Sequence, residues 1–217
     1  MTATSRILSV GDASALPGLA VPGNHDYYTP AAAASGSFER HFDAWQQGER
    51  IERYRYPFAQ RAGSFWLVAV NSSTPNRGLI DATGAVGPEQ LARLETLLDR
   101  LSPEPRILVT HYPICLADGH PEKRLHGLRD LSQVLAAIRN RGISLWLHGH
   151  RHHAYRLQRP PMAHFPVICS GSATQHGRAS YGLYDLAGNF LQGRRRQLNP
   201  ERNQFEDAEQ FQLELAC

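Results

Sequence analysis

Two apolar patterns alternate along the middle of the chain and predict repeated strand–helix units. Strand-like runs occupy Ser64–Val70, Arg106–Thr110 and Ile143–Leu147, and the unbroken apolar centre of the second is typical of a strand buried on both faces. Helix-like stripes lie between them, with Leu91, Leu94, Leu97, Leu98 and Leu101 in the first and Leu131, Val134, Leu135 and Ile138 in the second. The pattern therefore predicts an α/β fold.

Cap and turn residues mark the ends of these elements. Pro88 suits the first position of the first helix, and Asp130 with Gln133 resembles a capping box for the second. The last quarter of the chain changes to short strands, at Pro166–Ser170 and Tyr181–Leu186, joined by turn residues. We expect this part to pair in antiparallel fashion.

Side chains that commonly bind metals follow three short apolar runs. Asn24 comes after the run Leu19–Val21, His111 after the second predicted strand, and His150 and His152 after the third. If all three runs are parallel strands, these residues lie at the carboxyl ends, where open α/β sheets build their sites. A single histidine there is more often structural, but three matching contexts favour a ligand role.

The donor atoms of this set indicate the kind of metal. Asn24, His111, His150 and His152 combine imidazole nitrogen with amide oxygen, which fits a borderline divalent ion such as Mn, Fe or Zn. His150 and His152 are two residues apart in a turn, so they can serve one ion or two neighbouring ions.

Five ordered segments resemble the calcineurin-like metallophosphoesterases, in the branch that includes class III cyclic-nucleotide phosphodiesterases. The resemblance covers about Leu19 to Phe190. The segments are Val21-Pro22-Gly23-Asn24-His25-Asp26, Asn71-Ser72-Ser73, Gly87-Pro88-Glu89-Gln90-Leu91, Thr110-His111-Tyr112-Pro113 and Leu147-His148-Gly149-His150-Arg151-His152.

The resemblance implies an α/β fold in which two mixed β-sheets pack as a sandwich flanked by helices, with residues 1–217 forming a single domain. It also implies two divalent ions at the sheet ends. Asn24, His111 and His150 would bind one ion, and His152 would bind the other.

The chemistry that the resemblance implies is hydrolysis of a phosphoric ester, either a monoester or a diester. A metal-bound hydroxide would attack the phosphorus of a small substrate. His25 would donate a proton to the leaving oxygen or stabilise the phosphate, and Asp26 would orient its ring.

The N-terminus departs from the family pattern, which opens with Asp-x-His and continues to Gly-Asp-x-x-Asp. Here only Gly11-Asp12 remains, so Asp12 could bridge two metals, yet the stretch from Asp12 to Leu19 is short for a parallel crossover. We interpret the N-terminus as incomplete, lacking the first strand–helix unit and most of the second. A second hypothesis follows, in which the chain is a catalytically impaired relative that binds one ion or a partner without turnover.

Composition bears on the number of domains and the cellular compartment more than on the function. The 217 residues, 41% of them hydrophobic, suffice for one core, and the formal charge of +3 neither requires nor excludes nucleic acid. Three scattered cysteines and the absence of an apolar run near ~20 residues predict a cytoplasmic protein without a membrane span. The substrate, the metal and the oligomeric state stay open.

Overall fold

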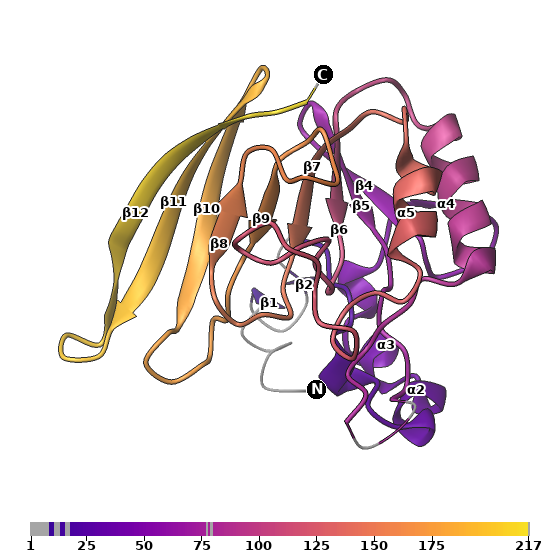
Figure 1. Ribbon diagram of the computed structural model, residues 1–217, viewed down its shortest axis with the longest axis horizontal. Coiled ribbons are helices and arrows are strands. Elements are labelled where there is room, and N and C mark those ends of the chain that lie inside the picture. Colours follow the sequence, from indigo (N-terminus) through magenta and orange to yellow (C-terminus); the bar gives the residue numbers. More distant parts are fainter. Residues whose placement is uncertain (1–8, 11–13, 16–17, 77, 79, 217) are drawn as a thin grey trace.

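A seven-stranded mixed sheet forms the centre of the protein, in a computed structural model that describes residues 9–10, 14–15, 18–76, 78 and 80–216 (Figure 1). In spatial order the sheet consists of β3 (Glu49–Arg50), β4 (Phe58–Ala62), β5 (Phe65–Ala69), β6 (Arg106–Val109), β7 (Ile143–His148), β9 (Val167–Cys169) and β8 (Tyr155–Leu157). Strands β5, β6 and β7 run parallel, as the repeated units predict. Strand β9 also runs parallel to β7, and antiparallel strands close both edges.

A second, three-stranded sheet packs on one face of the first and lies to its left in Figure 1. It is an antiparallel meander of β10 (Ser180–Ala187), β11 (Phe190–Asn199) and β12 (Gln204–Glu214). The short strands β1 (Ser9–Val10) and β2 (Ser14–Ala15) pair with each other. The two-sheet α/β architecture expected from the sequence is therefore present.

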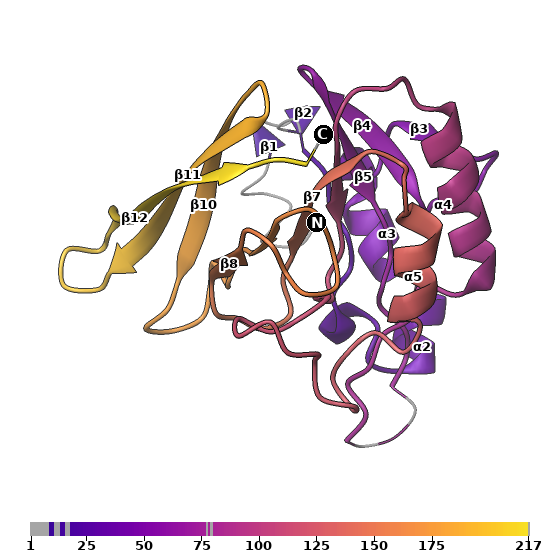
Figure 2. The same cartoon turned by 45° about the horizontal axis from the view of Figure 1, so that its top comes forward.

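Helices cover the opposite face of the seven-stranded sheet, as Figures 1 and 2 both show. Helix α4 (Pro88–Arg100) begins with its proline at the first helical position, as predicted, and packs beside α5 (Leu131–Ile138). The remaining helical segments are short and follow one another early in the chain: the 3-10 turns η1 (Asn24–Asp26) and η2 (Asp43–Trp45), and helices α2 (Pro30–Ser35) and α3 (Ser37–His41).

Alternation along the parallel strands divides the core into two layers. In β7, Leu145 faces the three-stranded sheet while Trp146 faces the helices, and in β6 Ile107 and Leu108 divide in the same way. All four side chains are at most 2% exposed, so the prediction that β6 is buried on both faces is confirmed. The layer between the sheets consists of Phe65, Ile107, Leu145, Ile168, Leu191, Leu213 and Leu215.

Two sequence predictions about strands are wrong. Leu19–Val21 is not a strand: the run is irregular, its Ala20 N–H donates to the Trp45 carbonyl at 2.9 Å, and Leu19 and Val21 pack beside Tyr56 and other apolar side chains. The prediction that Pro166–Ser170 pairs in antiparallel fashion is wrong in part: observed as β9, this strand pairs antiparallel with β8 but parallel with β7. In both cases the local pattern of apolar residues does not specify which segments the run will pair with in the folded chain.

The predicted capping box at the start of α5 is also absent. Asp130 occupies the N-cap position, but its side chain does not cap its own helix. Its carboxylate instead accepts hydrogen bonds from the backbone N–H groups of Val86 and Gly87, at 3.0 and 2.7 Å, just before α4 begins. This long-range contact fixes the start of α4 against the start of α5.

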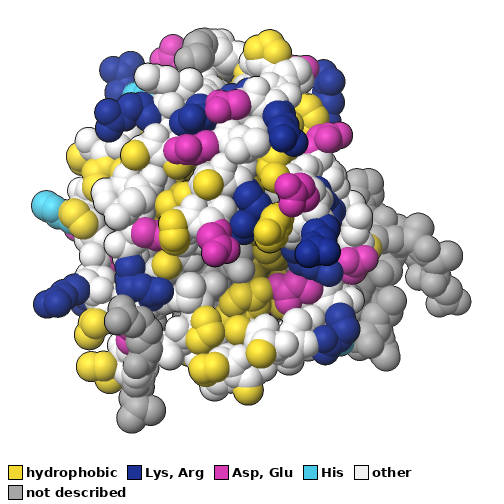
Figure 3. All heavy atoms as spheres, turned by 90° about the vertical axis from the view of Figure 1, so that its right-hand side faces the viewer, with side chains coloured by type: hydrophobic (Ala, Val, Ile, Leu, Met, Phe, Trp, Pro, Cys, Tyr) yellow, Lys and Arg dark blue, Asp and Glu magenta, His cyan; other side chains and the backbone are white. Residues whose placement is uncertain are grey.

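The surface over the helices is chemically mixed. Figure 3 faces the side of α4 and α5 and shows basic and acidic side chains interspersed, with no field of a single sign on that face. No helix in the described ranges is both long and apolar enough to cross a bilayer. Cys115 and Cys169 are buried free thiols.

The layer between the two sheets predicts a large stability effect from one side chain. Replacing fully buried Leu145 with Ala removes part of this layer and leaves a cavity, so the free energy of unfolding should fall by about 2–5 kcal/mol. The same change at Leu183, which is 37% exposed, should cost less than about 1 kcal/mol. Urea unfolding of both variants measures the difference, and equal losses would contradict the two-layer core.

Candidate metal centre

Parallel pairing of β6 and β7 brings two histidines to the same edge of the sheet. Val109 lies opposite Leu147 in the register, and the ladder continues past both strands. The Thr110 N–H donates to the Leu147 carbonyl at 3.1 Å, and the Gly149 N–H donates to the His111 carbonyl at 3.1 Å. The segments that carry His111 and His150 are thus hydrogen-bonded to each other.

Asn24 reaches the same edge on a loop rather than on a strand. Ser73 lies in the segment after β5, and its hydroxyl donates a hydrogen bond to the Pro22 carbonyl at 2.8 Å. This bond ties the loop to the sheet. Gly23 then passes so close to His111 that an added Cβ atom would lie 2.9 Å from the ring Cε1 atom. Only a residue without a side chain allows the loop to deliver Asn24, which is 4% exposed, against that ring.

Three donor atoms meet at the His111 ring. The Asn24 Oδ1 atom lies 2.8 Å from His111 Nε2, and His150 Nδ1 lies 3.2 Å from the same nitrogen. Two ligand atoms that each lie about 2.1 Å from an ion, at 90° to each other, are about 3.0 Å apart. The spacing and the mixed donor set therefore fit one divalent ion.

One of the three possible ligands is an amide, so a search for His, Cys, Asp and Glu side chains alone does not reveal the cluster. Nowhere in the described ranges do three His, Cys, Asp or Glu side chains gather as a metal-binding group. The cluster at His111 has two histidines, and its third member is the side-chain oxygen of Asn24. Oxygen and imidazole ligands together suit Mn, Fe and Zn, so the donor atoms do not identify which of these metals binds.

Burial keeps the two ring nitrogens available as ligands. The pKa of His111 is lowered to about 3, first by burial and then by the neighbouring histidines, of which His150 has the largest effect. The pKa of His150 is lowered to about 4, again mainly by burial, while a hydrogen bond to the His126 backbone opposes the shift. Both rings are thus neutral at pH 7, the state in which imidazole binds metal.

A second layer of contacts holds His111 in place. The Ser72 hydroxyl accepts hydrogen bonds from the backbone N–H groups of His111 and Tyr112, at 3.1 and 3.2 Å. The Tyr112 ring in turn lies against the His150 ring, with centroids 4.4 Å apart. The Gln90 side chain pairs with both backbone groups of Asn71, at 3.0 and 2.8 Å, and so fixes the turn that carries Ser72.

The loop between Cys115 and Leu128 supports the other histidine. Its Glu122 carboxylate pairs with the Arg151 guanidinium at 3.1 Å, and the Glu122 side chain is only 4% exposed. The backbone of His126 hydrogen-bonds the His150 ring. Contacts of this kind orient ligands and commonly affect metal affinity by 10–100-fold.

His25 and Asp26 lie in the same turn as Asn24 but are exposed. The His25 ring packs edge-on against Tyr28, with centroids 4.5 Å apart, and its charge contributes to lowering the pKa of His111. The Asp26 carboxylate accepts a hydrogen bond from the Gly23 N–H at 2.9 Å, which closes the turn. In this position Asp26 steadies the loop, while His25 stands at the rim of the cluster.

His152, another expected ligand, does not join the cluster. His152 is exposed, has a positive φ of 53°, and lines a separate hollow with Arg178 and Arg195. It still lies close enough to lower the pKa values of His111 and His150. Asp12 falls outside the described residues. The described chain therefore assembles ligands at one point, with His152 nearby.

Sequence reasoning did not assign roles to Gly23, Ser72 or Glu122. The first two stand within segments that resemble a known family, so their position carried a signal, but the contact that gives each its role crosses between distant segments. Glu122 lies in a loop whose pattern gave no indication of an ion pair with Arg151. Such contacts become visible only when the chain is folded.

The overall architecture is similar to that of several solved structures, two of which are named as phosphatases. A dimetal phosphatase from Danio rerio superposes with a TM-score of 0.63 at 15% identity, covering 91% of this chain and 72% of that one. A purple acid phosphatase from yellow lupin (Lupinus luteus) seeds gives 0.53 at 14% identity over 88% and 39%, and PhoD gives 0.57 at 10% over 73% and 42%. The chain thus spans about two fifths of the latter two proteins.

These likenesses show that the chain shares its fold with these solved structures. The identities are too low to carry an activity from those proteins to this one. Neither a known family model nor a curated protein sequence matches the chain.

The close approach of Gly23 to His111 gives a direct test of the cluster. In Gly23→Ala the added Cβ would meet the His111 ring at 2.9–3.0 Å, so the ring or the loop must shift and the affinity for Mn should fall at least about tenfold. Calorimetric titration with Mn measures the change. Gly78→Ala is the matched control, because its added Cβ meets nothing within 4 Å; an equal affinity in all three proteins would contradict the proposed ligand geometry.

Proposed function

We propose that the protein is a metal-dependent hydrolase of phosphoric esters, acting on a phosphomonoester or a phosphodiester. The observation that carries this proposal is the approach of Asn24 Oδ1 and His150 Nδ1 to 2.8 and 3.2 Å from His111 Nε2, at the edge of a fold shared with solved phosphatases. The named activities of the similar structures support the reaction class. The narrower assignment to the class III phosphodiesterase branch remains part of the proposal.

The residues of the chain have separate roles in this proposal. Asn24, His111 and His150 would hold the ion, which when bound acts as a Lewis acid toward phosphate oxygen and lowers the pKa of water. His25 at the rim would face the substrate and hold the proton that the leaving oxygen takes. Asp26, through the Gly23 N–H, would keep His25 and Asn24 in register with each other.

His152 and Asp12 complete the proposal as ligands of a second ion. His152 is exposed beside the cluster and free to turn toward an ion, since its side chain has no hydrogen bond or ion pair within the part of the chain that the structure describes. Asp12 keeps the role that the sequence suggests for it, as a carboxylate bridging two metals. Two ions clamp the attacking and leaving oxygens of a phosphate more effectively than one.

A second candidate function is binding of a single ion, or of a partner, without turnover. It is favoured by the gathering of ligand atoms at one point, with His152 outside the cluster. A site with three protein ligands can hold an ion firmly. This candidate predicts metal binding without hydrolysis, whereas the first predicts both.

Removal of one ligand tests the proposal. His150→Ala takes away a donor atom, so hydrolysis of p-nitrophenyl phosphate and bis(p-nitrophenyl) phosphate with added Mn should fall about a thousandfold or more, because a bound ion contributes several kcal/mol to the transition state. Asn24→Ala should act in the same direction. His164→Ala, which removes an exposed histidine from the loop before β9, is the matched control.

Each outcome has a distinct reading. Turnover that needs Mn and disappears in both ligand variants supports hydrolysis, and the preferred reagent shows whether a monoester or a diester is favoured. Unchanged turnover in His150→Ala would refute the assigned centre. A folded protein that binds one Mn per chain, loses it in His150→Ala and turns over neither reagent would establish the second candidate.

A further inference from the structure

Two adjoining hollows lie beside the loop that carries His150, and they share His153 and Arg178. Their volumes are about 250 and 350 Å³, and both are open to solvent. They lie near the lower end of the size range of small-ligand sites. The first hollow has no acidic side chain in its wall and is lined by His152, His153, Ala154, Arg178, Ser180, Arg195 and Gln197. We refer to His152, His153, Arg178 and Arg195 as the basic groove.

Arg178 is the free cation of this groove. It is exposed, lines both hollows, and its guanidinium makes no hydrogen bond or ion pair with any residue in the described ranges. A guanidinium presents five N–H donors in a planar fork that matches the oxygens of a phosphate. Without a protein carboxylate to occupy it, the fork is open to an anion from solution.

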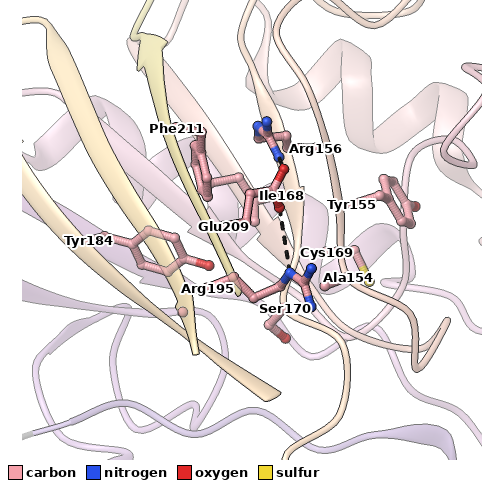
Figure 4. A pocket seen from close by; sticks show the side chains of 11 residues that line it. Ala154, Tyr155, Arg156, Ile168, Cys169, Ser170, Tyr184, Arg195, Glu209 and Phe211 are labelled. Carbon is pink, nitrogen blue, oxygen red and sulfur yellow. Dashed lines mark hydrogen bonds and ion pairs between the residues drawn. The ribbon is translucent and has the colours of Figure 1, made fainter. Parts of the chain in front are cut away.

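Arg195 is held in position rather than free. Its Nη1 atom donates to Gln197 Oε1 at 2.7 Å, and its Nε atom lies 3.5 Å from a Glu209 oxygen. Glu209 also pairs with Arg156 at 2.5 Å, and Figure 4 shows the two arginines on opposite sides of that one carboxylate. One negative charge between two guanidinium groups leaves the wall of the groove positively charged.

The groove is joined to the candidate metal centre through a short piece of chain. His150 belongs to the cluster and His152 to the groove, and two residues of backbone span at most about 7 Å. A ligand whose phosphate lies at the cluster would therefore present its neighbouring atoms to the groove.

We propose that the basic groove is an anion subsite that selects small phosphate esters carrying a second phosphate group a few bonds from the first. This inference rests on the proposed function, because it assigns the reacting phosphate to the metal centre. The second phosphate would bind the open fork of Arg178, with the side chain of Arg195 facing it from the wall. Charge-assisted bonds of this kind are the stronger class of hydrogen bond.

The walls favour a small molecule over a nucleic-acid strand. Binding of single strands combines a basic track with several aromatic side chains on which successive bases stack. Tyr155 is the sole Phe, Trp or Tyr among the residues that line the two hollows. The groove thus supplies the charge and lacks the stacking surface.

The test measures binding without metal, so that it does not depend on turnover. The full chain, freed of metal with EDTA, is titrated by calorimetry with inorganic pyrophosphate and with inorganic phosphate. Pyrophosphate carries more negative charge than phosphate, and the groove keeps its guanidinium groups without metal, so we expect pyrophosphate to bind at least about tenfold more tightly. Arg178→Ala should remove most of that difference, because one charge-assisted contact is lost. Arg139→Ala is the matched control, since this arginine is exposed on the helix side, at the end of α5.

The remaining outcomes are decisive. Equal affinity for the two anions, or equal weakening by Arg178→Ala and Arg139→Ala, would overturn the subsite. Binding that strengthens steadily with the length of an oligonucleotide would replace the small ligand with nucleic acid and so overturn the proposed class. Hydrolysis of p-nitrophenyl phosphate and of bis(p-nitrophenyl) phosphate, each of which has one phosphate, tests the proposed function separately. Turnover of either reagent without pyrophosphate selectivity refutes the groove alone, and selectivity without turnover of either reagent refutes hydrolysis alone.

Discussion

The parallel register of β5, β6 and β7 is the constraint on which the candidate centre depends. Because these strands run in the same direction, their carboxyl ends lie along one edge, and the segments that follow them are in contact. The turn after β5 then supplies the hydroxyl groups of Ser72 and Ser73, the segment after β6 supplies His111, and the segment after β7 supplies His150. If one of these strands ran in the opposite direction, its carboxyl end would lie at the other edge of the sheet, one strand length away from the other groups.

Burial on both faces of the sheet makes this edge rigid. The helices cover Trp146 and the three-stranded sheet covers Leu145, so β7 has no face exposed to water through its centre. The segment after β7 leaves this packed region at once and is further held by the Glu122–Arg151 ion pair. A ligand set on such a support needs little reorganisation to bind an ion, which is the condition for precise coordination.

The same loop faces two chemical environments. His150 is half-buried and neutral beside Asn24 and His111, whereas His152, two residues on, stands in the positively charged groove with Arg178. Neutral nitrogen and oxygen donors suit a cation, and guanidinium groups suit an anion. The cluster at His150 is therefore suited to a metal cation, and the neighbouring groove is suited to a phosphate group.

The sequence by itself determined the parallel strands, the two long helices and the positions of the candidate ligands, because hydrophobic periodicity and strand-end residues are local signals. It did not determine that Leu19–Val21 lacks a strand partner, that Asp130 binds the start of α4, or that Gly23 makes room for His111. It also gave no sign that His152 would turn away from His150 into a basic groove. These features arise from contacts between residues far apart in the chain, whose energy depends on which surfaces the fold brings together.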